Sequence, residues 1–227
     1  MRTFIRRSLW DVVPRDQRDT PEAFRRRQVV AAIVVLVGAI VLGWSLRLEP
    51  GGNTFYVAAV LLAGIWAAGA FLSGRLHLGR ISGGEVFIRP ILAPILLGLL
   101  LVGVFVLGSL VVREIDPLAD YVSSVLEYAD QGSLTILAAI TFVNGIAEEL
   151  FFRGAMYAAI PRHPVFWTTI AYVGATLATG NVMLAFAAIL LGTVCGLERR
   201  ASGGILAPIL THITWSLSML FLLPLLF

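Results

Sequence analysis

Long apolar segments alternate with short polar or charged ones along most of the chain. Seven of them are close to the roughly 20 residues that a helix needs to cross about 30 Å of hydrocarbon at 1.5 Å per residue. They cover residues 29–46, 54–73, 90–112, 133–152, 164–179, 181–197 and 203–227. This pattern predicts an all-α fold, a polytopic membrane helical bundle of about seven transmembrane helices. Because only Gly180 separates the fifth segment from the sixth, these two are expected to form a tight helical hairpin.

One segment, between the third and fourth apolar stretches, is amphipathic instead. Asp116 suits the N-cap of a helix and Pro117 its first turn. Apolar residues then recur at helical spacing, with acidic residues and serines on the opposite face, until Gly132. The pattern predicts a short helix along the outer surface of the bundle. Such a helix would be a simple connector or a gate to the interior.

The composition supports a chain that lies in lipid. Hydrophobic residues make up 58% of the 227 positions, charged residues only 14%, and the mean hydropathy is +0.88. We therefore predict one membrane-embedded domain at 29–227, after a basic cytosolic tail at 1–28 that sets the topology or binds anionic lipid head groups. No small-residue cleavage site follows the first span, which reads as an uncleaved anchor. The single cysteine, Cys195, excludes an internal disulfide and is expected to serve packing.

Arginine placement predicts the orientation. All 17 basic residues are arginine, and a cytosolic N-terminus would leave only Arg47 and Arg113 on the outer side. Positive residues are retained on the cytoplasmic side during insertion, so this alternation predicts an N-in/C-out protein of the cell membrane. The same count assigns Arg153 to the inner side of the membrane.

Charged residues inside the fourth span point to chemistry. Glu148 and Glu149 lie near its end, where each carboxylate would cost about 2.5–3.5 kcal/mol at the centre of a membrane. Glu149 and Arg153 are four residues apart, so we expect an ion pair within one helix. Glu148 is rotated about 100° away and shares a face with Asn144. In a cavity, this carboxylate would suit a general base that acts on water.

Two other spans carry polar pairs at the same spacing of four residues. His212 and Ser216 share a face of the last span, where they would donate hydrogen bonds to a developing oxyanion. Tyr172 and Thr176 share a face of the fifth span. The competing interpretation is that the histidine packs by hydrogen bonding and that the hydroxyls make helix–helix contacts.

The segment AEELFFRG, which holds Glu148, Glu149 and Arg153, resembles the EExxxR signature of the CPBP family of intramembrane glutamic endopeptidases, also called the CAAX protease or Abi family. The resemblance extends over a family core of about 133–227 and implies that Glu148 activates the attacking water, with support from Glu149 and Arg153. The family's second motif places a histidine where this chain has Thr176. Its third motif is matched by His212, but Ser216 replaces the expected Asn or Asp.

These departures from the family pattern leave several functions open. Threonine takes no proton at neutral pH, so turnover would be slow or lost unless His163 approaches from the inner loop. We predict hydrolysis of a membrane-associated peptide or protein that enters from the cytosolic half. A silent relative that binds or protects against a peptide is the alternative, and a proton-coupled transporter using Glu148 is less favoured.

Two acids and one histidine barely meet a zinc ligand set, so no metal or other cofactor is predicted. The bilayer is the other expected partner; no nucleic acid is expected, and the oligomeric state is left open.

Overall fold

The computed structural model describes residues 5–14, 17, 19–82 and 86–227. Its α-helices are α2 (Pro21–Ser45), α3 (Asn53–Ser73), α4 (Leu92–Val112), α5 (Asp116–Gln131), α6 (Leu134–Glu149), α7 (Tyr157–Ala159), α8 (Pro164–Leu177), α9 (Val182–Ser202) and α10 (Leu206–Leu222). The other described elements are the π-helices η1 (Arg6–Trp10) and η2 (Leu150–Met156), the 3₁₀-helix η3 (Leu223–Leu225) and the antiparallel strands β1 (Ile81–Ser82) and β2 (Phe87–Ile88).

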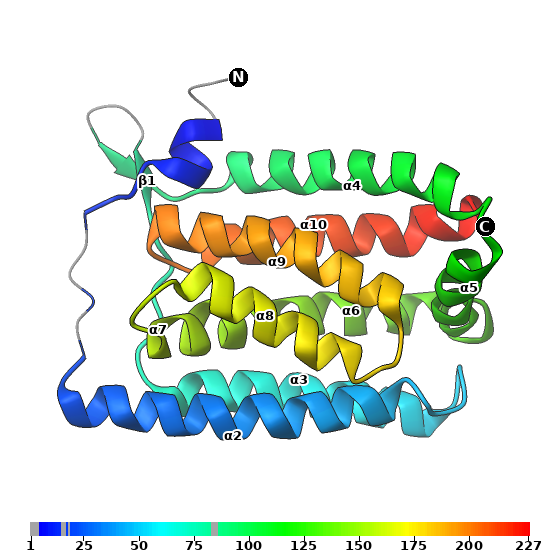
Figure 1. The fold of residues 1–227 in the computed structure, drawn as a ribbon, viewed down its shortest axis with the longest axis horizontal. Coiled ribbons are helices and arrows are strands. Elements are labelled where there is room, and N and C mark those ends of the chain that lie inside the picture. The colour runs from blue at the N-terminus through cyan, green and yellow to red at the C-terminus, as the bar shows by residue number, and fades with distance from the viewer. Residues whose placement is uncertain (1–4, 15–16, 18, 83–85) are drawn as a thin grey trace.

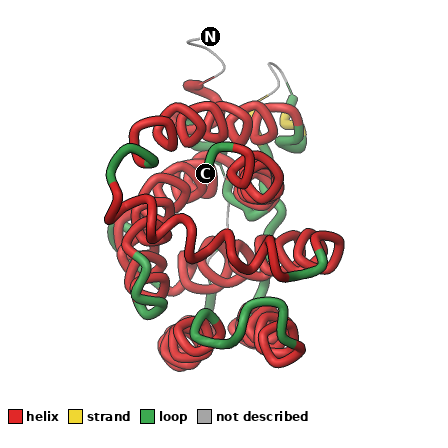
Figure 2. Tube along the Cα trace, turned by 90° about the vertical axis from the view of Figure 1, so that its right-hand side faces the viewer, coloured by secondary structure: helices red, strands yellow, loops and turns green. Residues whose placement is uncertain are grey.

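The long helices lie side by side along one direction and form a stacked bundle (Figure 1, Figure 2). The pair α2 and α3 forms one side, α4 forms the opposite side, and α6, α8, α9 and α10 lie between them. Helix α5 lies across one end of the bundle, beside the C-terminal end of the chain. This arrangement places α6 between α3 and α10 and buries Gly145, Ala147 and Glu149 in its C-terminal part.

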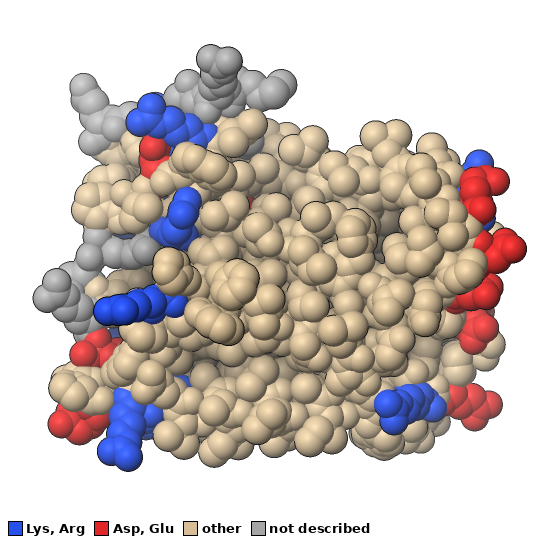
Figure 3. All heavy atoms as spheres, viewed as in Figure 1, with Lys and Arg blue, Asp and Glu red and all other residues tan. Residues whose placement is uncertain are grey.

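The surface has the distribution of polarity that a membrane requires. Charged side chains gather at the two ends of the bundle, and the wide belt between them is apolar (Figure 3). Large apolar side chains such as Leu36, Ile40 and Leu107 are exposed in this belt, where water would penalise them and lipid does not. Among the described residues, six helices are long and apolar enough to cross a membrane, and α8 is a shorter apolar helix. The chain is therefore an all-α, multi-pass membrane protein, while its exact number of crossings and its orientation stay predictions.

Several helices extend beyond the segments expected from the sequence. Helix α2 begins at Pro21, where the Thr20 side chain accepts a hydrogen bond from the Ala23 N–H at 3.3 Å, so residues 21–28 of the expected tail are helical. Helix α9 continues to Ser202, five residues past the apolar stretch that predicted it. Asp116 is not the N-cap of α5 but its first helical residue.

The fourth span differs most from expectation. After Glu149 the chain continues without a break through η2 and α7, so the helical segment ends at Ala159 rather than at 152. The two glutamates therefore lie in the middle of a span, not near its end. Arg153, expected at the inner side of the membrane, is fully buried in η2. The seven-residue π-helix is itself notable, since local widening of this kind is frequent at functional sites.

The described part of the N-terminal tail lies against the end of α9. The Val13 N–H donates to the Ala201 carbonyl at 3.1 Å, and the Gln17 side chain donates to the Gly203 carbonyl at 2.7 Å. These contacts hold the tail on the same end of the bundle as the N-terminus of α2.

Candidate active site

Glu149 is the centre of a buried polar cluster. Its side chain is fully buried, and its Oε1 accepts a hydrogen bond from Arg153 Nη1 at 2.9 Å. The predicted ion pair within the helix is thus present. The same oxygen lies 2.8 Å from Nδ1 of His212, which comes from α10. One carboxylate therefore joins the π-helix that follows α6 to a helix more than sixty residues further along the chain.

Small residues allow this close approach. A Cβ at Gly145 would lie 3.3 Å from Ile213 Cγ2 and 3.6 Å from His212 Cδ2, so the glycine lets α6 approach α10. The Arg153 guanidinium lies 4.8 Å from the centre of the Tyr172 ring, where its charge faces the π-electrons. A Cβ at Gly192 would come within 3.3 Å of Nη2 and within 3.4 Å of the Tyr172 ring. Glycines and an aromatic ring thus fit the arginine into the bundle.

Glu148 has a different environment from its neighbour. It is only partly buried, and its Oε2 accepts a hydrogen bond from the Tyr172 hydroxyl at 2.7 Å. It makes no hydrogen bond or ion pair with Arg153 among the described residues, as its rotation around the helix predicted. Asn144 binds the carbonyls of Ala59 and Ile140 instead, so it ties α6 to α3.

The two hydroxyl side chains of the expected site, those of Thr176 and Ser216, make no hydrogen bond to either glutamate among the described residues. Thr176 is buried, and its Oγ1 donates to the Tyr172 carbonyl one turn earlier at 2.8 Å. The residue in place of the expected histidine is therefore bonded to its own helix. The Ser216 hydroxyl is buried and has no hydrogen-bond partner among the described residues. It lines a cavity on the far side of His212, described below.

His163 does not reach the site. It is exposed at the start of α8 in a left-handed backbone conformation, with φ of 52°. Tyr172 follows nine residues later, which is about 13 Å along a helix at 1.5 Å per residue. The structure gives no hydrogen bond or ion pair between His163 and any described residue of the site.

Glu198 is a buried acid that the sequence reading missed. Its side chain is fully buried on α9, within electrostatic reach of Glu149 and Arg153. The Thr211 hydroxyl lies close to it but donates to the Pro94 carbonyl at 3.0 Å. Neither Glu198 oxygen has a hydrogen-bond partner among the described residues.

A signal for Glu198 was present in the sequence. The acid is followed by two arginines, and the predicted sixth span, 181–197, ends just before it. Yet Leu191, Cys195 and Glu198 are spaced as one helical face, and all three are buried. Extending the apolar face by one turn would have placed the carboxylate inside the bundle.

Replacement of Glu198 by methionine should raise the free energy of unfolding by about 1–3 kcal/mol, because a buried polar group without a hydrogen bond is costly and methionine has a similar volume. Thermal unfolding in detergent measures this change. The matched control is Glu127→Met on α5, an exposed position where little change is expected. A loss of stability at position 198 would show that the carboxylate has a stabilising partner.

No group of three or more His, Cys, Asp or Glu side chains in the described part of the chain comes together in a way that could hold a metal ion. The polar cluster is built from one guanidinium, one imidazole, three carboxylates and the Tyr172 hydroxyl. These groups can bind and orient a reacting molecule, and they can transfer protons.

Residues 130–218, about two fifths of the chain, match the protein family described as Rce1-like: Type II CAAX prenyl endopeptidase Rce1-like. The fold is that of a multi-pass membrane protein, and the matched residues are similar to type II CAAX prenyl endopeptidases. The recognition of the CPBP family from AEELFFRG is thereby confirmed over the matched residues, which include the whole candidate site. No curated protein and no solved structure matches the chain.

Proposed function

We propose that this chain hydrolyses a peptide bond of a membrane-associated peptide or protein, with Glu148 as the general base that activates water. The observation that carries the proposal is the contrast between the two adjacent carboxylates. Glu149 is sealed in contacts with Arg153 and His212, whereas Glu148 is partly exposed and held by one hydroxyl. The Tyr172 hydroxyl engages Oε2 and leaves Oε1 for a water molecule.

His212 would stabilise the oxyanion in this reaction. Its Nδ1 is engaged by Glu149, which fixes the orientation of the ring, much as a carboxylate orients a catalytic histidine in hydrolytic triads. In the imidazolium form, Nε2–H remains to donate to the oxygen of the tetrahedral intermediate. Glu149 and Arg153 are then positioning residues, since they act through the histidine and through the shape of the helix.

The test compares the peptide termini in the membrane proteome of cells that carry wild type or Glu148→Ala at matched expression. We expect a specific set of termini to disappear in the variant, because no other described side chain replaces the base. Leu150→Ala, two residues further along at the start of η2, is the control for a substitution in the same continuous helical segment. Identical termini in wild type and Glu148→Ala, with both proteins folded and inserted, would refute the hydrolase proposal.

A second candidate function is binding of a membrane peptide without cleavage. The observation in its favour is the Thr176 hydroxyl, which donates to a backbone carbonyl and offers the water no second base. This candidate keeps the same polar cluster and the same class of partner but removes turnover. Restoring a histidine at position 176 separates the two candidates, as argued in the Discussion.

A further inference from the structure

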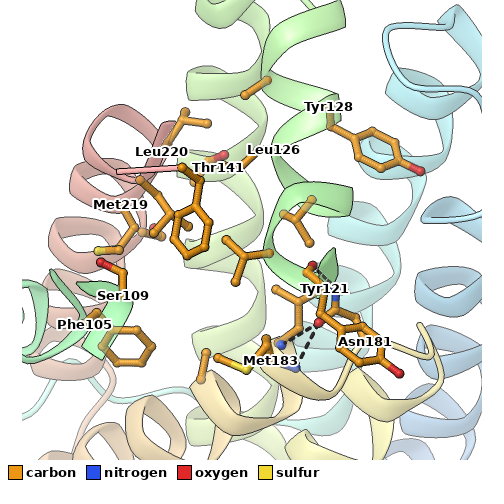
Figure 4. Close-up of a pocket in the computed structure, with 18 of the residues that line it drawn as sticks. Phe105, Ser109, Tyr121, Leu126, Tyr128, Thr141, Asn181, Met183, Met219 and Leu220 are labelled. Carbon is orange, nitrogen blue, oxygen red and sulfur yellow. Dashed lines mark hydrogen bonds between the residues drawn. The ribbon is translucent and has the colours of Figure 1, made fainter. Parts of the chain in front are cut away.

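A second feature of the bundle lies between the polar cluster and α5. A cavity of about 460 Å³, partly open to its surroundings, is lined mainly by α4, α5, α6, α9 and α10 (Figure 4). Its walls carry Phe105, Leu126, Met183, Met219 and Leu220, while the apolar face of α5 covers it. The volume falls within the range of about 300–1,000 Å³ that is typical of small-molecule sites.

The lining is uncharged, and three of its polar side chains are already hydrogen-bonded to carbonyl groups. None of the described lining residues is Arg, Lys, Asp, Glu or His. Ser109 donates to the Val106 carbonyl at 2.8 Å, and Tyr128 donates to the Leu48 carbonyl at 2.8 Å. Asn181 donates to the Tyr121 carbonyl at 2.6 Å, a contact drawn in Figure 4. A charged ligand would meet no opposite charge here, so nothing would offset the free-energy cost of removing its charge from water.

Two polar groups of the lining are buried without a partner. They are the Ser216 hydroxyl and the Trp215 indole N–H, which come from consecutive residues of α10. Unsatisfied buried polar atoms are rare in native proteins, so each needs an explanation. Both atoms are closed to solvent, so a rotation of these side chains would bring one donor and one hydroxyl to a ligand that is otherwise apolar.

We infer that this cavity binds a neutral single-chain lipid, an aliphatic chain that ends in one uncharged hydrogen-bonding group such as an alcohol. The chain would fill the space under α5, and the polar end would meet Ser216 and Trp215. A peptide segment fits less well, because each of its residues brings an N–H and a C=O that need partners in a dry environment. A helix about 10 Å across is also too wide for this volume.

The lipid site does not depend on the proposed hydrolysis. His212 and Ser216 are one turn apart on α10, but the histidine binds Glu149 and does not line the cavity. A protein without protease activity could still bind the lipid. Conversely, an active protease could have a cavity that is filled only by chains of the surrounding bilayer lipids. Binding is therefore measured directly, without an activity readout.

The chain offers a matched pair of variants for this test. Gly108 and Gly103 are both exposed glycines of α4, and a Cβ at either would meet no atom within 4 Å. Only Gly108 lines the cavity. Gly108→Phe should therefore fill it, whereas Gly103→Phe makes the same chemical change outside it. Ala187→Leu, which fills the cavity from α9, serves as a second blocking variant in case Gly108→Phe fails to fold.

The probe is 9,10-dibromooctadecan-1-ol, whose bromines quench nearby tryptophan fluorescence, added to the purified full chain in detergent. We expect saturable quenching in wild type and in Gly103→Phe, and loss of the saturable part in Gly108→Phe, Ala187→Leu and Trp215→Phe. The carboxylate analogue 9,10-dibromostearate should bind at least about tenfold more weakly, because its charge would be buried unpaired.

Three results would overturn the inference. Quenching that rises without saturation and equally in both glycine variants would mean simple partition of the probe into the micelle. Equal affinity for the alcohol and the carboxylate would remove the requirement for a neutral ligand. Displacement of the alcohol by an uncharged leucine-rich peptide, acetylated and amidated at its ends, would assign the cavity to a peptide rather than a lipid.

Discussion

Replacement of Glu149 by glutamine is expected to lower the free energy of unfolding by about 3–5 kcal/mol, since removing one partner of a buried ion pair leaves the other charge without compensation. The Arg153 guanidinium is fully buried, and its Nε and Nη2 already have no hydrogen-bond partner among the described residues. Its one described hydrogen bond to an acid is the bond to Glu149 at 2.9 Å. A neutral amide would keep the shape of the site but remove the negative charge. Thermal or denaturant unfolding in detergent measures the loss.

Glu148→Gln is the matched control for this prediction. It makes the same chemical change one residue earlier, where the side chain is only partly buried and its partner is the neutral Tyr172 hydroxyl. Its cost should stay near the 0.5–1.5 kcal/mol of an ordinary hydrogen bond, or about a quarter of the effect at Glu149. The double variant Glu149→Gln/Arg153→Met should recover part of the lost stability, because it removes the stranded charge as well. Equal stability of the two single variants would mean that Glu149 does not compensate the arginine.

Replacement of Thr176 by histidine is expected to accelerate formation of the termini that depend on Glu148 by about 10²–10⁴-fold, the usual contribution of one acid–base group. Thr176 lies one turn from Tyr172 on the same face of α8, and Tyr172 holds the Glu148 carboxylate. An imidazole there would reach towards the water that Glu148 is proposed to activate. The rate of appearance of these termini after induction of the variant is the measurement.

Thr176→Val separates the added base from the lost hydrogen bond. It removes the hydroxyl that donates to the Tyr172 carbonyl and supplies no group that takes a proton, so no acceleration is expected. If Thr176→His also leaves the termini unchanged while the protein folds, water does not occupy the site productively. Peptide binding without cleavage would then be the better account of the chain.

Much of this protein followed from local patterns. Apolar segments of about 20 residues dictated spanning helices, because backbone polar groups in lipid must be satisfied within the segment. The spacing of Glu149 and Arg153 predicted their ion pair, since residues four apart face each other in any helix. The family could be recognised from the same short segment, and the family match confirms it.

Helix ends and distant partners did not follow from these patterns. When the end of a span is placed just before a charged residue, the fourth helix ends before Arg153 and the sixth ends before Glu198. Both residues are buried, because neighbouring helices, and for Arg153 a counter-charge, shield them from lipid. No local rule reveals that shielding.

The sequence by itself determined that the chain is a membrane helical bundle, because composition and helical periodicity act over a few turns. It also led to the prediction that the chemistry centres on the two adjacent glutamates. Only the tertiary structure decided which carboxylate is sealed and which is accessible. That choice depends on contacts between helices far apart in the chain, from His212 to Glu149 and from Tyr172 to Glu148. Packing of whole helices brings these pairs together, and no spacing along the sequence encodes it.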